Sequence, residues 1–301
     1  MNPSCKLRLA IVGLGKMGML HWRTWHAIPD VHLVAAVDTD PRKVLWSNGE
    51  RVTIYPRCED LLGHIDAAVI ATPPGQHLPS SLPLLNAGVH CLIEKPLALT
   101  VVDSTRLVTA AKMHHARLAV GHSERFNPAI QYASEILYRN VRAIEVFRMA
   151  TPSIPAETDV VQDLMVHDLD WLVCALSQLP ESIRILDYCR AGRSLSRVSC
   201  ELTFANGPVV QLTSSRIEKK RRRELVLHRN SCETLNMNLD RVSFQAGKDP
   251  LTLQAYAFLD FLRGKTSPIA TGAESVQVMA IGDRIRADCF STEDGKLLEP
   301  R

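Results

Sequence analysis

Short apolar runs alternate with stretches of helical periodicity along the first 122 residues of the chain. The apolar runs predict strands over residues 6–12, 32–37, 66–71, 89–93 and 117–120. The periodic stretches predict helices over 16–28, 76–87 and 100–115, with a short helix after Pro41. Continuous apolar strands alternating with helices are typical of a parallel sheet whose two faces are both covered. We therefore predict an α/β domain over residues 1–122.

The pattern changes beyond residue 122, where strand-like runs follow one another with few helices between them. These runs cover residues 143–149, 182–189, 197–204, 209–216, 224–228 and 234–239. Helical spacing is confined to 127–138, 160–176, 250–263 and 273–287. The pair Asn206-Gly207 between two of the runs is a strong hairpin signal. Residues 123–301 are thus predicted to form an α+β domain with a large, mostly antiparallel open sheet. We expect this domain to bind substrate and to form oligomers.

Length and composition restrict the class of protein. With 301 residues the chain exceeds the size at which a single core stops growing, so two domains are expected. A hydrophobic content of 46% and a charged content of 22% are ordinary for a globular protein. The net charge of +3 is too small to indicate a nucleic-acid partner. The N-terminus does not resemble a signal peptide, and no apolar stretch is long enough to span a membrane, so we expect a cytoplasmic location.

The eight cysteines are scattered without any Cys-x-x-Cys pair, which indicates free thiols in a reducing compartment. The histidines have no neighbours at metal-ligand spacing. We predict neither a disulfide framework nor a metal site.

A glycine motif follows the first predicted strand and opens the first predicted helix. Its glycines are Gly13, Gly15 and Gly18. In a dinucleotide site the first glycine permits the tight turn, the second lets the backbone approach the pyrophosphate, and the third allows close packing of helix on strand. Lys16 and Met17 begin the helix, whose N-terminal N–H groups attract phosphate. We assign this loop to a Rossmann-type cofactor site, the alternative being a purely structural turn.

Asp38 lies twenty residues after Gly18, at the end of the second predicted strand. An acid at this position accepts hydrogen bonds from the ribose hydroxyls of the cofactor. The same carboxylate would repel a 2′-phosphate, which favours NAD over NADP. The nearby Arg42 weakens that preference.

Further candidate residues stand where two later strands end. Thr72 and Pro73 are expected to contact the cofactor through their backbone, and His77 starts the helix that follows. Glu94 and Lys95 follow the fourth apolar run, at the carboxyl end of a strand, which is where open α/β sheets bind ligands. We count these five residues among the cofactor-binding positions. The alternative for the lysine is a surface side chain.

Asp163 and His167 are four residues apart in a predicted helix and so share one of its faces. Histidine can take the proton of an alcohol at neutral pH, because its unperturbed pKa is about 6.5. Our hypothesis is that His167 is the base, that Asp163 orients it, and that Lys95 binds the hydroxyl and polarises the nascent carbonyl. The reverse assignment, with lysine as base, stays open. The bland alternative is a buried structural histidine.

Taken together, these motifs resemble the Gfo/Idh/MocA oxidoreductases, and the resemblance covers nearly the whole chain. The strings that carry it are Gly13 to Gly18, Asp38, Ala71 to Pro74, His77, Glu94-Lys95-Pro96 and Asp163-xxx-His167. The resemblance implies a Rossmann domain, a second open-sheet domain, and hydride transfer between NAD(P) and a sugar or cyclitol hydroxyl. It implies that the lysine and the histidine sit beside the nicotinamide. Pro96 is often preceded by a cis peptide in this family, and dimers or tetramers through the C-terminal sheet are common.

A narrower resemblance is to the branch that oxidises the 3-hydroxyl of UDP-N-acetylglucosamine. It is carried by residues 121–128 and 162–170, and by Ser215-Arg216 ahead of a basic stretch. That branch implies a pathway aminotransferase as partner and a 3-amino sugar for lipid A or a related glycan. The predicted substrate-binding residues are Lys95, Glu124, Arg125, Asn127, His167 and Arg216. For the three at 124–127 the alternative is an interdomain salt bridge.

The basic run 216–223 is the one strong charge block of the sequence. Arginine forks bind phosphate oxygens, so Arg216 could hold a diphosphate. The alternative is a solvated hairpin edge that charge protects from aggregation. Two further functions are weighed: a dehydrogenase of inositol or another free sugar, which needs no diphosphate site, and a silent NAD-binding sensor. The sensor predicts loss of Lys95, Asp163 or His167, and all three are present.

Overall fold

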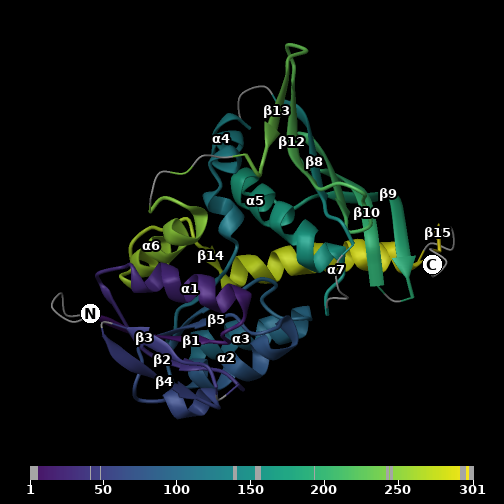
Figure 1. Ribbon diagram of the computed structural model, residues 1–301. Helices are drawn as coiled ribbons and strands as arrows, with labels where there is room; N and C mark the ends of the chain where they lie inside the picture. Colours follow the sequence, from purple (N-terminus) through teal and green to yellow (C-terminus); the bar gives the residue numbers. More distant parts are fainter. Residues whose placement is uncertain are drawn as a thin grey trace. The chain divides into compact units, whose positions relative to one another are not determined.

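We describe a computed structural model of the chain, covering residues 6–40, 42–47, 49–137, 141–152, 157–192, 194–241, 244, 247–291 and 296–297. The chain forms two compact units (Figure 1). The first comprises residues 1–123 together with 246–276, and the second comprises 124–245 together with 277–301. The segment 246–276 therefore groups with the N-terminal unit, whereas the sequence interpretation placed it in the second domain.

The first unit is built on an eight-stranded sheet in the order β14-β7-β6-β5-β1-β2-β4-β3. Its strands are β1 (Leu7–Val12), β2 (Val31–Val37), β3 (Leu45–Ser47), β4 (Glu50–Tyr55), β5 (Ala67–Ile70), β6 (His90–Ile93), β7 (Leu118–Val120) and β14 (Ala270–Thr271). The six inner strands of this order, β7, β6, β5, β1, β2 and β4, pair with one another in parallel. The edge strands β14 and β3 each pair with their neighbour in antiparallel fashion. The strand order reverses at β1, which is where dinucleotides bind in Rossmann folds. The predicted fold of this unit is confirmed.

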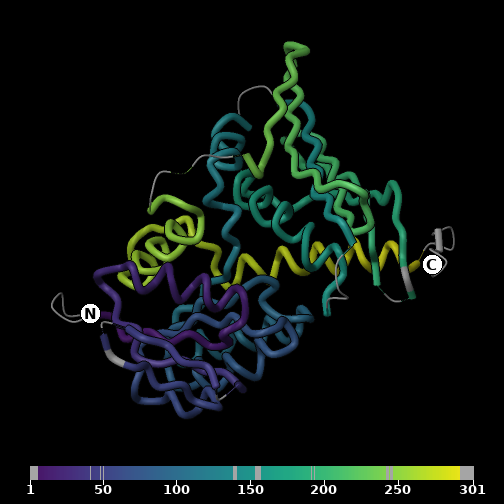
Figure 2. The backbone as a smooth tube through the Cα atoms, viewed as in Figure 1, coloured from purple at the N-terminus to yellow at the C-terminus, as the bar shows by residue number. Residues whose placement is uncertain are grey.

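Helices cover both faces of this sheet. They are α1 (Lys16–His26), α2 (His77–Asn86), α3 (Val101–Met113) and α6 (Pro250–Leu262). Figure 2 traces α6, far along the sequence, to a position beside α1. The fully buried ring of Trp25 on α1 meets Phe258 on α6 edge-on, with ring centroids 6.1 Å apart. This aromatic contact and the pairing of β14 with β7 explain why 246–276 belongs to the first unit.

One local prediction was wrong in this unit. The short helix expected after Pro41 does not form: residues 42–44 are irregular, and β3 then pairs with β4 in antiparallel fashion. Alternation of buried and exposed residues in Leu45–Ser47, with Leu45 and Ser47 facing inward, suits a strand at the sheet edge. Pro41 itself lies outside the described residues.

The second unit contains a seven-stranded sheet in the order β13-β12-β8-β11-β10-β9-β15. Its strands are β8 (Val141–Met149), β9 (Ser182–Ala191), β10 (Ser194–Thr203), β11 (Val209–Ser215), β12 (Arg222–Arg229), β13 (Thr234–Asn238) and β15 (Lys296–Leu297). Only β8 with β11 and β9 with β15 pair in parallel among the described residues, so the predicted mostly antiparallel sheet is confirmed. The Asn206-Gly207 turn joins β10 to β11 as an antiparallel hairpin, as predicted.

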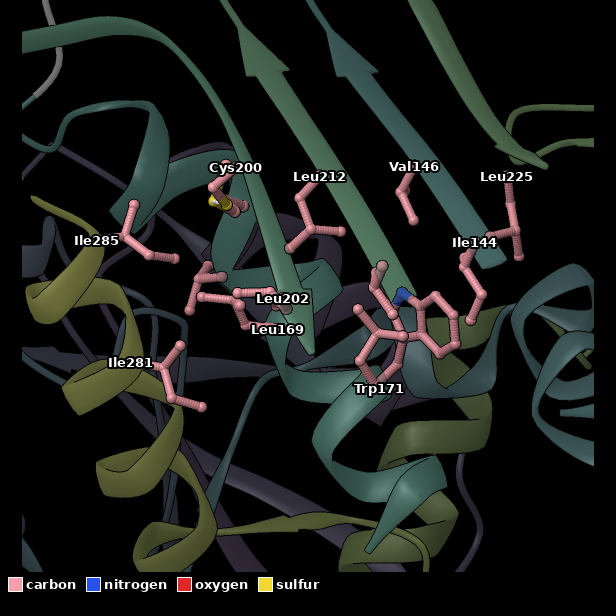
Figure 3. Packing of buried hydrophobic residues seen from close by; sticks show 14 of the residues in the cluster. Ile144, Val146, Leu169, Trp171, Cys200, Leu202, Leu212, Leu225, Ile281 and Ile285 are labelled. Atoms are coloured by element: carbon pink, nitrogen blue, oxygen red, sulfur yellow. Dashed lines mark hydrogen bonds between the residues drawn. The ribbon is translucent and has the colours of Figure 1, made fainter. Parts of the chain in front are cut away.

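Helices cover one face of this sheet and bury its apolar side chains. These helices are α4 (Pro128–Ile136), α5 (Val166–Leu176) and the part of α7 (Gly272–Ser291) that follows residue 276. Figure 3 shows Trp171 and Leu169 of α5, and Ile281 and Ile285 of α7, reaching toward the strands. The strand side chains that meet them include Ile144, Val146, Cys200, Leu202, Leu212 and Leu225. The predicted helix 127–138 is shorter, and Tyr138 lies outside the described residues.

None of the helices among the described residues is both long enough and apolar enough to cross a membrane. The described cysteines are all free thiols, and the described residues contain no cluster of potential metal ligands.

Candidate active site

The glycine motif lies between β1 and α1 and is held by close backbone contacts. Gly13 has a φ of +86°, and a Cβ there would come within 2.9 Å of the carbonyl oxygen of Ala71 at the end of β5. A Cβ on Gly18 would lie 1.8 Å from the carbonyl oxygen of Gly13. Both positions therefore exclude any side chain, which accounts for the turn and for the close packing of helix on strand that the motif predicts.

The same loop leaves room for a pyrophosphate. A Cβ on Gly15 would meet nothing within 4 Å, although this residue caps the N-terminus of α1. The first turn of the helix begins with Lys16, contains no acidic residue, and has no side-chain cap, so its N–H groups and its partial positive charge are available to phosphate. Met17 beside it is 37% exposed, consistent with a position at the edge of a ligand site. These features fit NAD.

Asp38, just beyond the end of β2, is tied to the glycine loop. Its Oδ2 accepts hydrogen bonds from the backbone N–H of Leu14 and from Nζ of Lys43, both at 2.7 Å, and its Oδ1 accepts the N–H of Asp40 at 2.9 Å. Lys43 also donates to the carbonyl oxygen of Leu14 at 3.0 Å. Burial acts to raise the pKa of Asp38, but the ammonium and the two N–H donors outweigh it and hold that pKa below its usual value. The acid is therefore ionised and fixed in place.

His77 braces two loops at the carboxyl ends of β5 and β6. Its Nδ1 lies 2.8 Å from the carbonyl oxygen of Pro96, and its Nε2 lies 3.0 Å from that of Thr72. The ring is 1% exposed, and burial lowers the pKa of His77 although the two carbonyl oxygens act in the opposite direction. Its role here is to hold Thr72, Pro73 and Pro96 in position, and a direct cofactor contact stays a prediction.

Glu94, at the end of β6, is buried beside the glycine-loop helix. Its Oε1 lies 2.7 Å from Nε2 of His21 on α1, and its Oε2 accepts the backbone N–H of Lys95 at 3.3 Å. Burial acts to raise the pKa of Glu94, but the hydrogen bond from His21 and the neighbouring positive charges lower it below its ordinary value. A Cβ on Gly121 would come within 2.9 Å of this carboxyl group, so the carboxylate sits directly on the β7 end.

Lys95 follows this buried carboxylate and precedes a cis peptide bond to Pro96, as the family resemblance implied. Its backbone is therefore held by Glu94 on one side and, through Pro96, by His77 on the other. The lysine stands at the carboxyl end of a central parallel strand, the location that favours a ligand-binding role over a plain surface residue.

In the second unit, Asp163 and His167 lie where a π-helical turn, Val161–Met165, runs into α5. Such turns are frequent at functional sites. Oδ2 of Asp163 accepts a hydrogen bond from Arg216 at 3.1 Å, and the same guanidinium donates to the carbonyl oxygen of Thr158 at 2.8 Å. Arg216 directly follows β11, and its side chain is 14% exposed. These contacts favour a role for Arg216 in holding Asp163 over the predicted contact with a diphosphate.

The three predicted residues at 124–127 are engaged inside the second unit. Arg125 makes a bidentate ion pair with the fully buried Asp170, both N–O distances being 2.7 Å. Glu124 accepts hydrogen bonds from Nη2 of Arg223 at 2.6 Å and from Nη2 of Arg148 at 3.4 Å. These pairs lie within one unit and not between domains, which differs from the alternative considered for them. A substrate role for these side chains stays a prediction.

Asn127 caps α4, accepting the N–H of Ala129 at 3.0 Å, while its amide donates to the carbonyl oxygen of Leu239 at 3.1 Å. Both ends of its side chain thus have structural partners. A substrate contact by this asparagine remains an expectation.

The basic run 216–223 also finds partners nearby. Arg221 and Arg223 both pair with Asp240, at 2.8 and 3.1 Å. The guanidinium of Arg222 lies 3.7 Å from the centre of the Phe147 ring. Arg222 and Arg223 belong to β12, which lies between β13 and β8 and so is not the sheet edge that the alternative for this run supposed.

Sequence reasoning missed two residues of the cofactor half, His21 and Lys43. His21 stands three residues after Gly18, on the same helix, and that spacing was the available signal. Lys43 stands five residues after Asp38, so a search for charges around the ribose acid would have found it. Lys95 belongs to the first unit and His167 to the second.

Comparison with known proteins agrees with this geometry. The model of a family described as "Oxidoreductase family, NAD-binding Rossmann fold" matches residues 7–122. A UDP-N-acetylglucosamine 3-dehydrogenase of Acidithiobacillus ferrooxidans is 31% identical over 222 residues, which are 73% of this chain and 70% of that protein. Inositol 2-dehydrogenase 1 of Saccharopolyspora erythraea is 30% identical over 217 residues, 65% of this chain and 61% of that protein.

The similarity extends to three dimensions. A solved structure of the Acidithiobacillus ferrooxidans UDP-N-acetylglucosamine 3-dehydrogenase matches this fold with a TM-score of 0.77 and 26% sequence identity. The match covers 94% of this chain and 97% of that one, so it includes residues of both compact units.

Proposed function

Because this chain belongs to the Gfo/Idh/MocA family of NAD-binding oxidoreductases, we propose that it is a dehydrogenase that oxidises the 3-hydroxyl of UDP-N-acetylglucosamine. The product would be the 3-keto nucleotide sugar. A ketone at this position is the substrate that an aminotransferase requires, so a pathway aminotransferase that makes a 3-amino sugar, as in lipid A, is the expected partner. The observation that carries the proposal is the similarity to a protein of that activity over 73% of the chain, with Lys95, Asp163 and His167 all present.

Oxidation of a secondary alcohol removes a hydride from carbon and a proton from oxygen. NAD, when bound, would supply the acceptor for the hydride. We assign the proton to Nε2 or Nδ1 of His167, whose uncharged imidazole can accept it at neutral pH. Asp163, held by Arg216, would stabilise the imidazolium that forms. The ammonium of Lys95 would donate to the reacting oxygen and polarise it as the carbonyl develops.

The cofactor half supplies binding and orientation. The Gly13–Gly18 loop and the N-terminus of α1 would hold the pyrophosphate, and Asp38 would accept the adenosine ribose hydroxyls. Thr72 and Pro73 follow β5 next to this loop, and Oγ1 of Thr72 is a buried hydroxyl without a hydrogen-bond partner among the described residues. That hydroxyl fits a cofactor contact. Asp38 taken by itself favours NAD as the cofactor, because its carboxylate would repel a 2′-phosphate.

A second candidate function is the oxidation of inositol or another free sugar. It is favoured by the similarity to an inositol 2-dehydrogenase at 30% identity, nearly as high as that to the nucleotide-sugar enzyme. The internal contacts of Arg216 also favour it, because Nη1 and Nη2 of this residue already donate to the carbonyl oxygen of Thr158 and to Asp163.

The test is NADH formation at 340 nm with UDP-N-acetylglucosamine, myo-inositol and glucose as alternative substrates. A matching aminotransferase and glutamate are added in parallel samples to remove the ketone. Turnover of the UDP-sugar alone supports the proposal. Turnover of a free polyol alone replaces it by the second candidate, and silence with all three, alongside tight NAD binding, supports a non-catalytic sensor.

The assigned roles are tested in the same assay with purified variants. His167→Ala is expected to lower turnover by about two to four decades, because it removes the acid–base group. Lys112→Ala, on an exposed turn of α3, serves as the control and should leave turnover unchanged. A loss of less than about tenfold for His167→Ala would exclude this histidine as the base.

We also propose a cytoplasmic enzyme that forms dimers or tetramers through the open face of the second sheet. The free thiols of the described residues fit a reducing compartment. In the part of the second unit that the structure describes, helices cover one face of the sheet, and the other face would take a partner. Sedimentation of the purified chain tests the association.

A further inference from the structure

The ribose acid of the cofactor site has a close cationic neighbour. Nζ of Lys43 lies 2.7 Å from Oδ2 of Asp38 and 3.0 Å from the carbonyl oxygen of Leu14 in the glycine loop. An ammonium group has three N–H donors, so these two contacts leave one for another acceptor. The lysine side chain is 33% exposed and the aspartate 11% exposed, which places the lysine on the solvent side of the pair.

A second ion pair lies next to the first one. Arg42 donates from Nε to Oδ1 of Asp40 at 2.9 Å, and the backbone N–H of Asp40 donates to Asp38. The arginine side chain is 87% exposed. An exposed ion pair of this kind is weak and exchanges readily with other partners. The segment from 38 to 43 therefore presents two carboxylates and two cations, with no net charge.

The absence of net charge in this segment changes which cofactor, NAD or NADP, the site is expected to bind. A ribose acid without a cationic partner repels a 2′-phosphate, which carries a charge of about −1.5 to −2 at neutral pH. Here the ammonium of Lys43 neutralises Asp38 at contact distance and can donate to phosphate oxygens. With the 2′-hydroxyl of NAD, Asp38 remains an acceptor for the ribose diol. The same four side chains thus suit either form of the adenosine ribose.

We infer that Lys43 is a residue that determines cofactor selection, and that it enables the enzyme to accept NADP as well as NAD. In the NAD complex Lys43 stays on Asp38, and in the NADP complex it binds the 2′-phosphate with Arg42 as a second ligand. The inference rests on the dinucleotide site of the proposed function but not on its sugar substrate. It revises the preference for NAD that Asp38 alone suggests.

The experiment is calorimetric titration of the full-length apoprotein with NAD⁺ and with NADP⁺, without any sugar. Wild-type protein is expected to bind both, with dissociation constants within about tenfold of one another. Lys43→Ala should weaken NADP⁺ binding by about ten- to a hundredfold, the usual effect of losing a charge-assisted hydrogen bond. NAD⁺ binding should change by less than about threefold, because Asp38 retains its backbone donor Leu14.

Two further variants separate charge from structure. Lys43→Arg keeps the charge and should retain NADP⁺ binding within about threefold, and Arg42→Ala should give a smaller loss than Lys43→Ala. Lys112→Ala is the control for general charge effects. Titration with adenosine 2′,5′-bisphosphate and with 5′-AMP isolates the adenosine end, and Lys43→Ala should weaken only the bisphosphate.

Either of two results would overturn the inference. Wild-type protein that binds NADP⁺ more than a hundredfold less tightly than NAD⁺ would mean that Asp38 still excludes the phosphate. Equal losses of NAD⁺ and NADP⁺ binding in Lys43→Ala would mean that the lysine only fastens the glycine loop. Because no sugar is present, a failed sugar assay does not affect this outcome.

Discussion

Arg148 of β8 provides the clearest test of how the second unit is held together. Its guanidinium donates to Asp168 at 2.8 Å and 2.6 Å, and to Glu124 at 3.4 Å, and its side chain is 3% exposed. Asp168 accepts one further bond, from the indole N–H of Trp171 at 3.3 Å. In Arg148→Met the apolar part of the side chain is largely kept, but a buried carboxylate loses its cation.

Removing one partner of a buried ion pair costs about 3–5 kcal/mol, because the remaining charge is left uncompensated. A domain of about 150–250 residues loses roughly 2–4 °C in Tm for each kcal/mol, so a decrease of about 6–20 °C is expected. Arg184→Met is the matched control, since Arg184 pairs with Glu201 across two strands but is 67% exposed. Exposed pairs contribute about 0–1 kcal/mol.

The assay is thermal and urea unfolding of the full-length protein, followed by tryptophan fluorescence, with Tm, urea midpoint and slope compared between variants. The double variant Arg148→Met with Asp168→Asn removes the uncompensated charge and should recover about 1–3 kcal/mol of the loss. If Arg148→Met were no more destabilising than Arg184→Met, the ion network would contribute nothing and our assignment of it as structural would fail.

Three further outcomes concern the first unit. Gly18→Ala should lower both NAD binding and protein stability, because the new Cβ would lie 1.8 Å from the carbonyl oxygen of Gly13. Gly15→Ala should lower NAD binding alone, since its Cβ would meet no protein atom within 4 Å. Calorimetry measures the binding, and thermal unfolding measures the stability. His90 has a pKa below its ordinary value of 6.5, because burial and the charge of Arg117 lower it more than the charge of Asp66 raises it. As the pH falls, the unfolded chain therefore binds a proton at His90 before the folded chain does. The free energy of unfolding decreases as the pH drops through about 6.5. His90→Asn keeps an acceptor for the N–H of Arg117, which lies 3.0 Å from Nδ1 of His90, and should reduce the slope of stability against pH between about pH 7.5 and 5.5. Part of the slope remains, because burial also lowers the pKa of His77. An unchanged slope in urea unfolding would contradict the prediction.

Much of the fold could be predicted because local patterns determine it. Continuous apolar runs became buried parallel strands, and β1 and β5 pair along Leu9–Val12 without an irregularity. The glycine motif was correctly placed because its steric demands are local to one turn. Strands β3, β4 and β14 were missed. The edge strands β3 and β14 are short, carry little periodicity and depend on a neighbour for their hydrogen bonds. Strand β4 lies inside the sheet, but exposed Arg51 and Thr53 flank buried Val52, so it shows no continuous apolar run.

The roles of charged side chains were harder to predict, because a charge can satisfy itself with any partner that folding brings close. The diphosphate contact of Arg216 stays a prediction, and the side chain that the structure places against it, Asp163, is 53 residues away in sequence. Glu124 accepts a hydrogen bond from the guanidinium of Arg223, which is 99 residues away in sequence. No local sequence pattern predicts such pairs. The sequence therefore indicated what chemistry each residue can perform, but not which residue it contacts.

The return of residues 246–276 to the first unit has a consequence for the order of events during synthesis. Domains generally fold from the N-terminus as the chain emerges. Here the packing of α6 on α1 and the pairing of β14 with β7 require residues up to 271, which are translated after most of the second unit. A nascent chain that ends at residue 123 would expose Trp25 and leave one edge of its sheet open. The N-terminal unit is thus the first to begin folding on the ribosome and cannot be completed until nearly nine-tenths of the chain has been made.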